Sequence, residues 1–431
     1  MLKYSYRNLL ILLFITTFSN LIISQTRYLI GDINNDGVIN VQDIVRIVNI
    51  ILQNDLPPTE YELWAADVNV DNAINIQDII IVIEVILDLQ CPDQFQFPCE
   101  YNLSECCIDS TSHFYAWEID TLGAFGSVLM DVVIIEENDV WAVGEIRLST
   151  DVQDEYNAAH WDGTSWELMR ITAQPSYIYS QFDCNAAFSS SDIWVAANVP
   201  LYGDGEVWQG FFGGIYPYGM GWMNEIWGRD SNDIYFVHDD GNVVHKLGEE
   251  FYIVPTDTNQ RLQDIDGQDT GDLYLVSGWE DSGESIVLLG DENGLTEFYS
   301  TNQYPPTDST YGRVSSVEII DQTAYLSTVS GLWIYNLEDD SSQLLPANDI
   351  GFNNRRYIDI ASADHNDIIF LSAWFVINHF NGVDWYQNTQ FLEMFGDANI
   401  FSRAIDLRGN FVVAVGKEVE GGHAIIARGY R

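Results

Sequence analysis

Basic residues are scarce in this chain. Lysine and arginine number 17 against 65 aspartates and glutamates in 431 residues, which gives a net charge of −48. Such a surface repels the phosphates of nucleic acids and anionic lipid headgroups. We therefore expect neither nucleic acid nor a membrane surface among the partners. Hydrophobic residues still make up 47% of the chain, so the acidity does not indicate disorder.

Long apolar runs are missing beyond the N-terminus, so we expect no membrane-spanning helix in the rest of the chain. The first residues carry Lys3 and Arg7, followed by an apolar core at residues 9–14. This order is typical of a secretory signal peptide, which we place at residues 1–24, and an uncleaved anchor is the alternative. The sequence thus predicts a secreted protein, extracellular or associated with the cell surface.

Cysteine is limited to five residues. Four of them fall in a short linker, residues 91–112: Cys91, Cys99, Cys106 and Cys107. In a secreted chain such clustering predicts two disulfides. Outward pairing of Cys106 and Cys107 with Cys91 and Cys99 is favoured, because a bond between neighbouring cysteines is strained. A zinc site is the alternative, and the fifth cysteine, Cys184, is expected to be a buried thiol.

The motifs of familiar enzymes are also missing. The seven histidines form neither a Ser-His-Asp signature nor an HExxH motif, and the glycines form no phosphate-binding loop. A sialidase-like site needs a cluster of arginines, and 355–356 is the only adjacent arginine pair. The many acidic residues leave a two-carboxylate glycosidase or lyase site open.

What the sequence does contain is one acidic segment that occurs twice. Residues 31–52 read GDINNDGVINVQDIVRIVNIIL, and residues 66–87 read ADVNVDNAINIQDIIIVIEVIL, 35 positions further along. In each copy, potential oxygen ligands fall at positions 1, 3, 5, 7, 9 and 12 of an EF-hand calcium loop. The predicted ligands are Asp32, Asn34, Asp36, the Val38 carbonyl, Asn40 and Asp43 in the first loop, and Asp67, Asn69, Asp71, the Ala73 carbonyl, Asn75 and Asp78 in the second.

The crowding of carboxylates predicts two Ca²⁺ sites, because these groups repel one another unless a cation lies among them. An Asp/Asn-rich turn that only caps a helix is the alternative, and the repetition argues against it. The second site is expected to be weaker. Position 6, where the backbone turns sharply, is Gly37 in the first loop but Asn72 in the second.

Each loop leads into a largely apolar stretch, residues 44–52 and 79–87, and no entering helix precedes it. This loop-then-helix pair, a small all-α module over residues 25–90, resembles a type I dockerin, the module that binds cohesin domains in cellulosome-like assemblies. The resemblance implies a cohesin-like partner that contacts loop positions 10 and 11. These positions are Val41, Gln42, Ile76 and Gln77. The Ser-Thr pair of cellulosomal dockerins is missing here, so the identity of the partner stays open.

From residue 113 onward the chain shows short apolar runs, turn residues and aromatics, but no helical period. An Asn/Ser-Asp-aromatic element recurs about every 45 residues, centred on Trp141, Trp194, Tyr235, Tyr274, Tyr325, Ile369 and Val412. This period, at four strands per unit, predicts an all-β seven-bladed β-propeller over residues 113–431. Residues 113–120 are expected to complete the last blade and close the ring. The hairpins WDGTSW and FNGVDW loosely resemble those of kelch and Asp-box propellers, which supports the architecture alone.

Three aspartates stand eight residues before the aspartate of this element: Asp131, Asp264 and Asp359. On the innermost strands they would line one level of the central channel and could bind a cation or a sugar hydroxyl. The alternative is that they satisfy backbone donors between strands. Tryptophans near loop ends offer flat faces to sugars, although packing between blades is the simpler explanation for those on outer strands.

The sequence as a whole predicts a secreted, calcium-binding, modular protein. Its dockerin-like module would join a cohesin-type or other extracellular partner. Its propeller would bind a ligand, such as a carbohydrate, or present an interaction surface without catalysis. One alternative is a dockerin-borne glycoside hydrolase or lyase in polysaccharide catabolism. Another is a calcium-stiffened spacer that has no cohesin partner.

Overall fold

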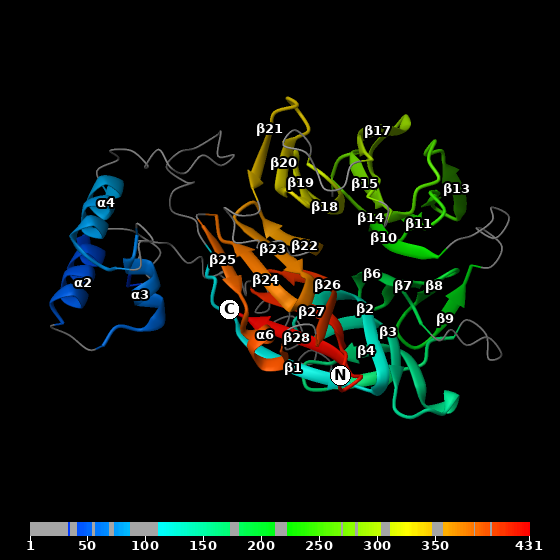
Figure 1. The fold of residues 1–431 in the computed structure, drawn as a ribbon, viewed down its shortest axis with the longest axis horizontal. Coiled ribbons are helices and arrows are strands. Elements are labelled where there is room, and N and C mark those ends of the chain that lie inside the picture. The colour runs from blue at the N-terminus through cyan, green and yellow to red at the C-terminus, as the bar shows by residue number, and fades with distance from the viewer. Residues whose placement is uncertain are drawn as a thin grey trace, which may run out of the picture. The chain divides into compact units, whose positions relative to one another are not determined.

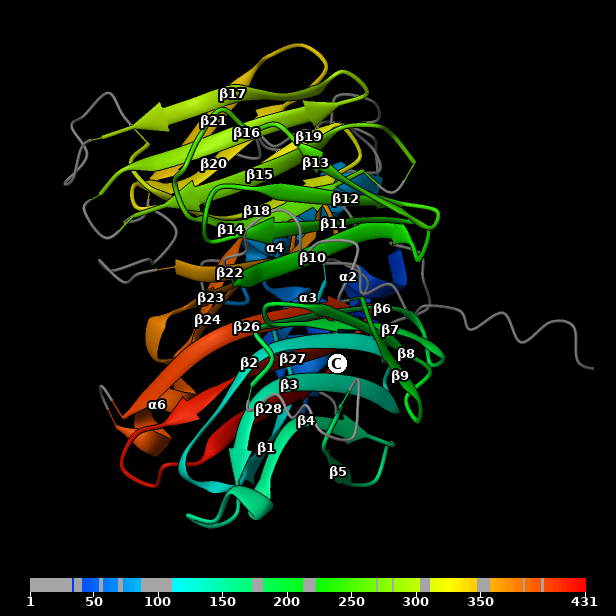
Figure 2. The same ribbon diagram turned by 90° about the vertical axis from the view of Figure 1, so that its right-hand side faces the viewer.

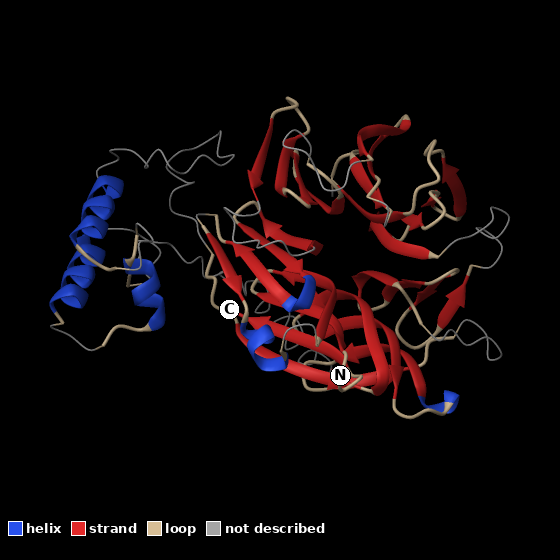
Figure 3. Cartoon of the chain, in the orientation of Figure 1, coloured by secondary structure: helices blue, strands red, loops and turns tan. Residues whose placement is uncertain are grey.

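The computed structural model of the protein describes residues 33–34, 41–53, 57–68, 73–86, 111–172, 181–211, 222–268, 270–280, 283–302, 311–346, 357–382, 384–396 and 399–431. The chain divides into two compact units, residues 1–111 and 112–431 (Figures 1 and 3). The first is helical and the second consists almost entirely of strands. No helix among the described residues is long and apolar enough to cross a bilayer.

The first unit contains α2 (Val41–Leu52), α3 (Glu60–Ala66) and α4 (Ile76–Ile86). Helices α2 and α4 follow the two acidic loops and pack against each other. Their shared core consists of Ile33, Ile47, Ala65, Ala66, Val68 and Val82. Helix α3 begins at a capping box, in which Thr59 and Glu62 each bond the other's backbone N–H. The Arg46 guanidinium donates to Glu62 at 2.5 Å, which joins α2 to α3.

The second unit is a seven-bladed β-propeller, which confirms the predicted fold class. Each blade is an antiparallel four-stranded sheet, and in the first six the innermost strand comes first (Figures 1 and 2). The first three blades consist of β2 (Ala124–Glu136), β3 (Asp139–Arg147), β4 (Glu155–Trp161) and β5 (Trp166–Met169); β6 (Cys184–Ser189), β7 (Asp192–Ala196), β8 (Pro200–Gly203) and β9 (Trp208–Gly210); and β10 (Met223–Asp230), β11 (Asp233–His238), β12 (Val243–Leu247) and β13 (Glu250–Val254).

The next three blades consist of β14 (Leu262–Gly267), β15 (Tyr274–Trp279), β16 (Ser285–Asp291) and β17 (Gly294–Thr301); β18 (Val314–Ile320), β19 (Thr323–Thr328), β20 (Gly331–Asn336) and β21 (Ser342–Pro346); and β22 (Tyr357–Asp364), β23 (Asp367–Ser372), β24 (Val376–Phe380) and β25 (Trp385–Asn388). The last blade combines β26 (Ile400–Arg408), β27 (Phe411–Glu418) and β28 (Ala424–Tyr430) with β1 (Ala116–Leu122). Short helices η1 (Val152–Asp154), η3 (Ala373–Phe375) and α6 (Gln390–Phe395) lie between strands.

The recurring sequence element lies on the second strand of every blade, and its apolar side chains are buried between neighbouring sheets. In three blades its aspartate hydrogen-bonds a histidine of the third strand. These pairs are His160 with Asp139 at 2.9 Å, His245 with Asp233 at 2.6 Å and His379 with Asp367 at 2.9 Å. The histidines of these pairs therefore hold the second and third strands together, as polar groups inside a sheet must be bonded.

Strand β1 lies at the outer edge of the last blade and pairs antiparallel with β28, from Ala116 opposite Tyr430 to Leu122 opposite Ala424. It begins three residues later than the strand expected from the sequence, residues 113–120. A chain segment from the start of the unit thus completes a sheet formed by its end, which leaves no unpaired blade.

A buried polar cluster, here called the closing clasp, lies beside this junction and consists of His113, Asp367, His379, Asp384 and Arg431. The Arg431 guanidinium donates to both Asp367 oxygens, at 3.0 and 2.5 Å. His113 hydrogen-bonds the Asp384 carboxylate at 2.8 Å and the His379 ring at 2.9 Å. Burial lowers the pKa of His379 to about 4, so this ring is neutral at pH 7. The clasp ties the first and last residues of the unit to its sixth blade.

Candidate functional site

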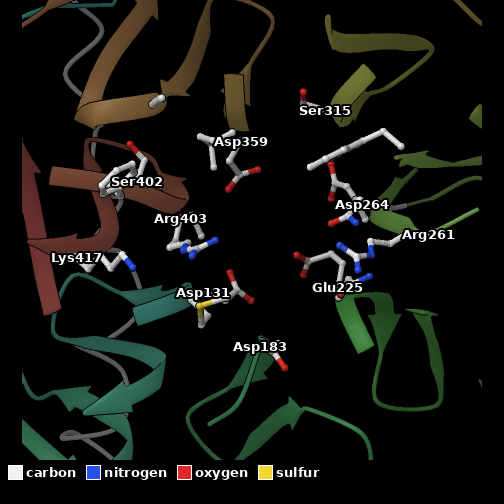
Figure 4. Close-up of a pocket in the computed structure, with 18 of the residues that line it drawn as sticks. Asp131, Asp183, Glu225, Arg261, Asp264, Ser315, Asp359, Ser402, Arg403 and Lys417 are labelled. Atoms are coloured by element: carbon white, nitrogen blue, oxygen red, sulfur yellow. The ribbon is translucent and has the colours of Figure 1, made fainter. Parts of the chain in front are cut away.

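A cavity of about 780 Å³ lies at the centre of the propeller, on the face where the innermost strands begin (Figure 4). All seven blades contribute to its lining. Concave sites of about 300–1,000 Å³ are the usual size for small-ligand binding. The lining of the cavity includes carboxylic acids, here called the floor, three basic residues and large aromatics, together with smaller polar and aliphatic side chains.

The three aspartates singled out from the sequence, Asp131, Asp264 and Asp359, all line this cavity from β2, β14 and β22. In each of them, Oδ1 accepts from the N–H of the next residue. Each Oδ2 accepts from an N–H on the innermost strand of the following blade. These donors are Asn185 at 2.7 Å, Val317 at 2.7 Å and Ile405 at 2.9 Å, respectively. The carboxyl groups therefore latch neighbouring blades together while they face the cavity.

A fourth carboxyl group, that of Glu225 on β10, points into the same cavity (Figure 4). Sequence reasoning missed it. Glu225 stands eight residues before Asp233, the same spacing as for the three aspartates, so a search for either acid would have found it. Its Oε1 accepts from the N–H of Ile226 at 3.0 Å.

Burial dominates the electrostatics of this floor. Burial, together with the charges of Asp406 and Asp264, raises the pKa of Asp131 to about 7, although two backbone N–H groups oppose the shift. Burial raises the pKa of Glu225 and of Asp359 well above the ordinary range, and neighbouring carboxylates add to both shifts. The pKa of Asp264 is also raised by burial. At neutral pH much of the floor therefore consists of uncharged acids that can donate hydrogen bonds.

Basic side chains line the cavity despite their scarcity in the chain. They are Arg261, just before β14, Arg403 on β26 and Lys417 on β27. Within the described part of the chain, neither Arg261 nor Lys417 forms an ion pair. The Lys417 ammonium lies 5.8 Å from the centre of the Phe401 ring. The sequence offered no signal for these residues, because they belong to no repeated pattern.

Aromatic rings form the third part of the lining: Trp279, Trp374 and Phe401. Trp374 lies in η3 with φ 64° and ψ 31°, and Phe375 follows with φ 53°. Positive φ is uncommon for bulky residues, and such strain persists only where surrounding contacts hold it. Here the Ser402 hydroxyl accepts from the Phe375 N–H at 2.8 Å and donates to the Ser372 carbonyl at 2.7 Å. These bonds hold the turn that brings Trp374 to the cavity.

No group of three or more acidic, histidine or cysteine side chains among the described residues is arranged to hold a metal ion. In the cavity, the latch aspartates direct their oxygens to backbone N–H groups rather than to a common point. A cation is therefore a poor match for this floor, although the sequence allowed one there.

The predicted calcium ligands are described only in part. Asn34, Asp43, Asp67, Ala73, Asn75 and Asp78 are described, whereas Asp32, Asp36, Val38, Asn40, Asn69 and Asp71 lie outside the described residues. Asp43 and Asp78, both at loop position 12, are fully buried. Asp43 accepts from the N–H of Asn34 at 3.2 Å, and Asp78 from that of Asn75 at 2.7 Å. Fully buried carboxylates require charge compensation, and an all-oxygen set of ligands suits Ca²⁺, so these residues fit the cation.

The predicted partner-binding positions are the first two residues of each of the two longer helices. Val41 and Gln42 start α2, Ile76 and Gln77 start α4, and all four are exposed. Val41 and Ile76 are 63% and 69% exposed, which is unusual for branched apolar residues. Val45 and Ile80 continue the same exposed face one turn later, at the same offset of 35 residues.

The disulfides and the signal peptide stay predictions from the sequence. Cys91, Cys99, Cys106 and Cys107 and residues 1–24 lie outside the described residues. Cys184 is a buried free thiol on β6, and burial raises its pKa well above the ordinary value. It is therefore inert as a nucleophile at neutral pH.

Residues 30–87 match the family described as Dockerin type I domain, so this segment is a dockerin module, as its sequence indicated. Dockerin domains in general bind calcium and interact with cohesins. They are typically extracellular or on the cell surface. No curated protein matches the chain.

Solved structures resemble the propeller. A structure titled YCF48 bound to D1 peptide is 13% identical with a TM-score of 0.54, and the match covers 75% of this chain and 97% of that one. YCF48 from Cyanidioschyzon merolae is 13% identical with a TM-score of 0.51, covering 73% and 98%. The WD40 β-propeller domain of Doa1 is 11% identical with a TM-score of 0.51, covering 74% and 98%. At such low identity the likeness shows the fold alone.

Proposed function

We propose that this protein is an extracellular binding subunit of a larger assembly. Its calcium-loaded dockerin module attaches to a cohesin-type partner, and its propeller binds a carbohydrate in the central cavity without catalysing a reaction. One observation carries the proposal: a single chain combines a dockerin module with a propeller whose cavity is lined by hydrogen-bonding and aromatic side chains from all seven blades.

Calcium takes a structural part in this proposal. The six oxygen ligands of each loop surround one ion, and the ion balances the buried charges of Asp43 and Asp78. Because both carboxylates lie at the start of the core-forming helices, ion binding and packing of α2 against α4 are coupled. Asn72 at the sharp turn of the second loop makes that site the weaker of the two.

The cohesin-type partner docks on the exposed apolar faces of α2 and α4. Each face starts at loop positions 10 and 11, Val41-Gln42 or Ile76-Gln77, and continues to Val45 or Ile80. The two faces are near copies related by the internal repeat, so either can present the same chemistry to one partner. Their composition calls for an apolar contact surface on that partner.

A binding role suits the floor better than catalysis. Both oxygens of Asp131, Asp264 and Asp359 accept backbone N–H groups, which makes them part of the blade contacts. The competing function is glycoside hydrolysis or a lyase reaction, and Glu225 supports it. Its raised pKa, next to carboxylates, resembles that of a general acid.

The proposal is tested by retention of the full-length protein on immobilised cohesin domains, with Ca²⁺ or with a chelator. We expect retention only with Ca²⁺, and its loss in Asp43→Ala combined with Asp78→Ala. Retention that ignores the chelator, or no retention on any cohesin, contradicts the tethering role.

The binding role is tested separately by incubation with a panel of polysaccharides. We expect binding and no release of reducing ends or unsaturated sugars. Release that disappears in Glu225→Gln makes the protein an enzyme and overturns the non-catalytic reading.

A further inference from the structure

The distribution of positive charge in the propeller points to a specific kind of ligand. Only 17 residues of the whole chain are basic, and three of them line one cavity. Figure 4 shows Arg261 and Arg403 on opposite sides, with their guanidinium groups toward the cavity, and Lys417 beside Arg403. Three basic side chains in one cavity are unexpected in a protein of net charge −48. The contacts of these side chains show whether their charges are available to a ligand.

Four other arginines of the propeller, Arg147, Arg229, Arg428 and Arg431, form ion pairs with carboxylates inside the fold. Arg431 bonds Asp367, Arg428 bonds Asp120 at 2.8 Å, and Arg229 bonds Asp233 at 2.6 Å. By contrast, Arg261 and Lys417 form no ion pair within the described part of the chain. Their charges face the cavity although 65 acidic residues are available. An anionic group in the cavity would pair with them directly.

The acids of the floor repel an anion less strongly than their number suggests. Asp131 is buried, Glu225 and Asp359 are half-buried, and the pKa values of all three acids are raised. In the neutral form each donates a hydrogen bond and repels no negative charge. The same groups suit sugar hydroxyls, which both donate and accept.

The aromatic lining supplies a third kind of contact, with the apolar face of a sugar ring. Trp374 reaches the cavity on the strained turn held by Ser402. One face of Trp279 is covered by the Arg313 guanidinium, 4.3 Å from the ring centre. Flat indole rings pack against the C–H faces of sugar rings, so the cavity combines sites for a carboxylate, for hydroxyls and for an apolar ring face.

We infer that the propeller cavity recognises the carboxylate of an acidic sugar, the uronic-acid type found in anionic polysaccharides, with Arg261 and Lys417 as its anion-binding residues. The inference rests on the proposed carbohydrate-binding function and names the class of sugar. The whole-molecule charge disfavours long-range attraction, but at physiological salt that field is screened beyond about 8 Å. Recognition therefore depends on contacts inside the cavity.

The test is titration calorimetry of the full-length protein in Ca²⁺ with trisaccharides of galacturonic, mannuronic and guluronic acid, each beside its neutral counterpart. At pH 6 we expect at least one uronate trimer to bind about tenfold or more tightly than its neutral counterpart, because hydrogen bonds between charged groups are stronger than those between neutral ones. The preference should shrink at pH 8, where Asp131 is ionised.

Variants identify the residues. Arg261→Gln and Lys417→Gln are each expected to weaken uronate binding about tenfold or more, with little effect on a neutral sugar, and Arg261→Lys should retain most of the binding. Arg170→Gln is the matched control, since Arg170 bonds the Glu155 carbonyl on the first blade and does not line the cavity. Melting temperatures verify that each variant is folded.

Two outcomes overturn the inference, and they are distinguishable. Equal binding of uronate and neutral trimers, unchanged in Arg261→Gln, rejects acidic-sugar recognition and leaves the proposed carbohydrate binding intact. Binding of no saccharide, charged or neutral, rejects both.

Discussion

The carboxyl group of Asp131 should make the stability of the propeller fall as the pH rises. Its pKa is about 7 in the folded protein against an ordinary value of 3.8, because burial and neighbouring charges outweigh the backbone N–H groups. Well below pH 3.8 the group is protonated in both states and contributes nothing to pH dependence. Between these pKa values the unfolded chain releases its proton first, so stability falls. Above pH 7 the full loss is about 4 kcal/mol.

Asp131→Asn removes this titration. The amide oxygen can still accept from one of the two N–H donors, Val132 or Asn185, but the amide NH₂ then faces the other. One unsatisfied buried N–H costs about 1–3 kcal/mol at every pH. The variant should therefore be less stable than the natural protein at pH 4 and more stable at pH 8. The removed charge also lowers the pKa of Glu225 and Asp359, which acts in the same direction.

The assay is urea unfolding followed by tryptophan fluorescence, at unit steps from pH 4 to 8 with constant Ca²⁺. The control is Asp204→Asn, in an exposed turn where the N–H groups of Val207 and Glu206 lower the pKa of the carboxyl group. Because the pKa of Asp204 is lowered, this carboxyl group titrates only at acid pH. The free energies of unfolding of Asp204→Asn and the natural protein should therefore differ by a constant amount from pH 5 to 8. If the unfolding free energies of Asp131→Asn and of the natural protein also differ by a constant amount over that range, Asp131 does not titrate there and the reasoning is refuted.

Three further predictions follow from other parts of the molecule. Removing Ca²⁺, or the change Asp43→Asn, should reduce the helical circular dichroism signal and the stability of the first unit. A ligand at 100 times its dissociation constant adds about 2.7 kcal/mol to the free energy of unfolding. A circular dichroism signal that does not change with chelator would contradict this. Arg431→Gln leaves the Asp367 carboxylate buried without its bidentate partner, so unfolding in urea should show a loss of about 3–5 kcal/mol, whereas Arg170→Gln should lose little. Val41→Asp combined with Ile76→Asp should abolish cohesin retention while calorimetry shows unchanged Ca²⁺ binding; retention by the double variant would exclude these faces.

Local chemistry explains what the sequence alone could predict. Each calcium loop takes all its ligands from twelve consecutive residues, so the spacing of the residues from Asp32 to Asp43 is enough to predict the site. The blades repeat one element about every 45 residues, so their number could be counted before any contact was known. The eight-residue interval before the repeat aspartate placed Asp131, Asp264 and Asp359 on innermost strands for the same reason.

Only the tertiary structure decided what those residues do. The latch of Asp131 ends on Asn185, 54 positions away, and the clasp joins His113 to His379 across 266; no local pattern encodes such contacts. Arg261, Arg403 and Lys417 belong to no repeat, and Trp374 depends on a strained turn that Ser402 holds. A local motif determines which chemistry a segment can perform. The ring of blades determines which side chains meet at its centre, because the cavity is lined by short stretches from all seven blades that lie far apart in the sequence.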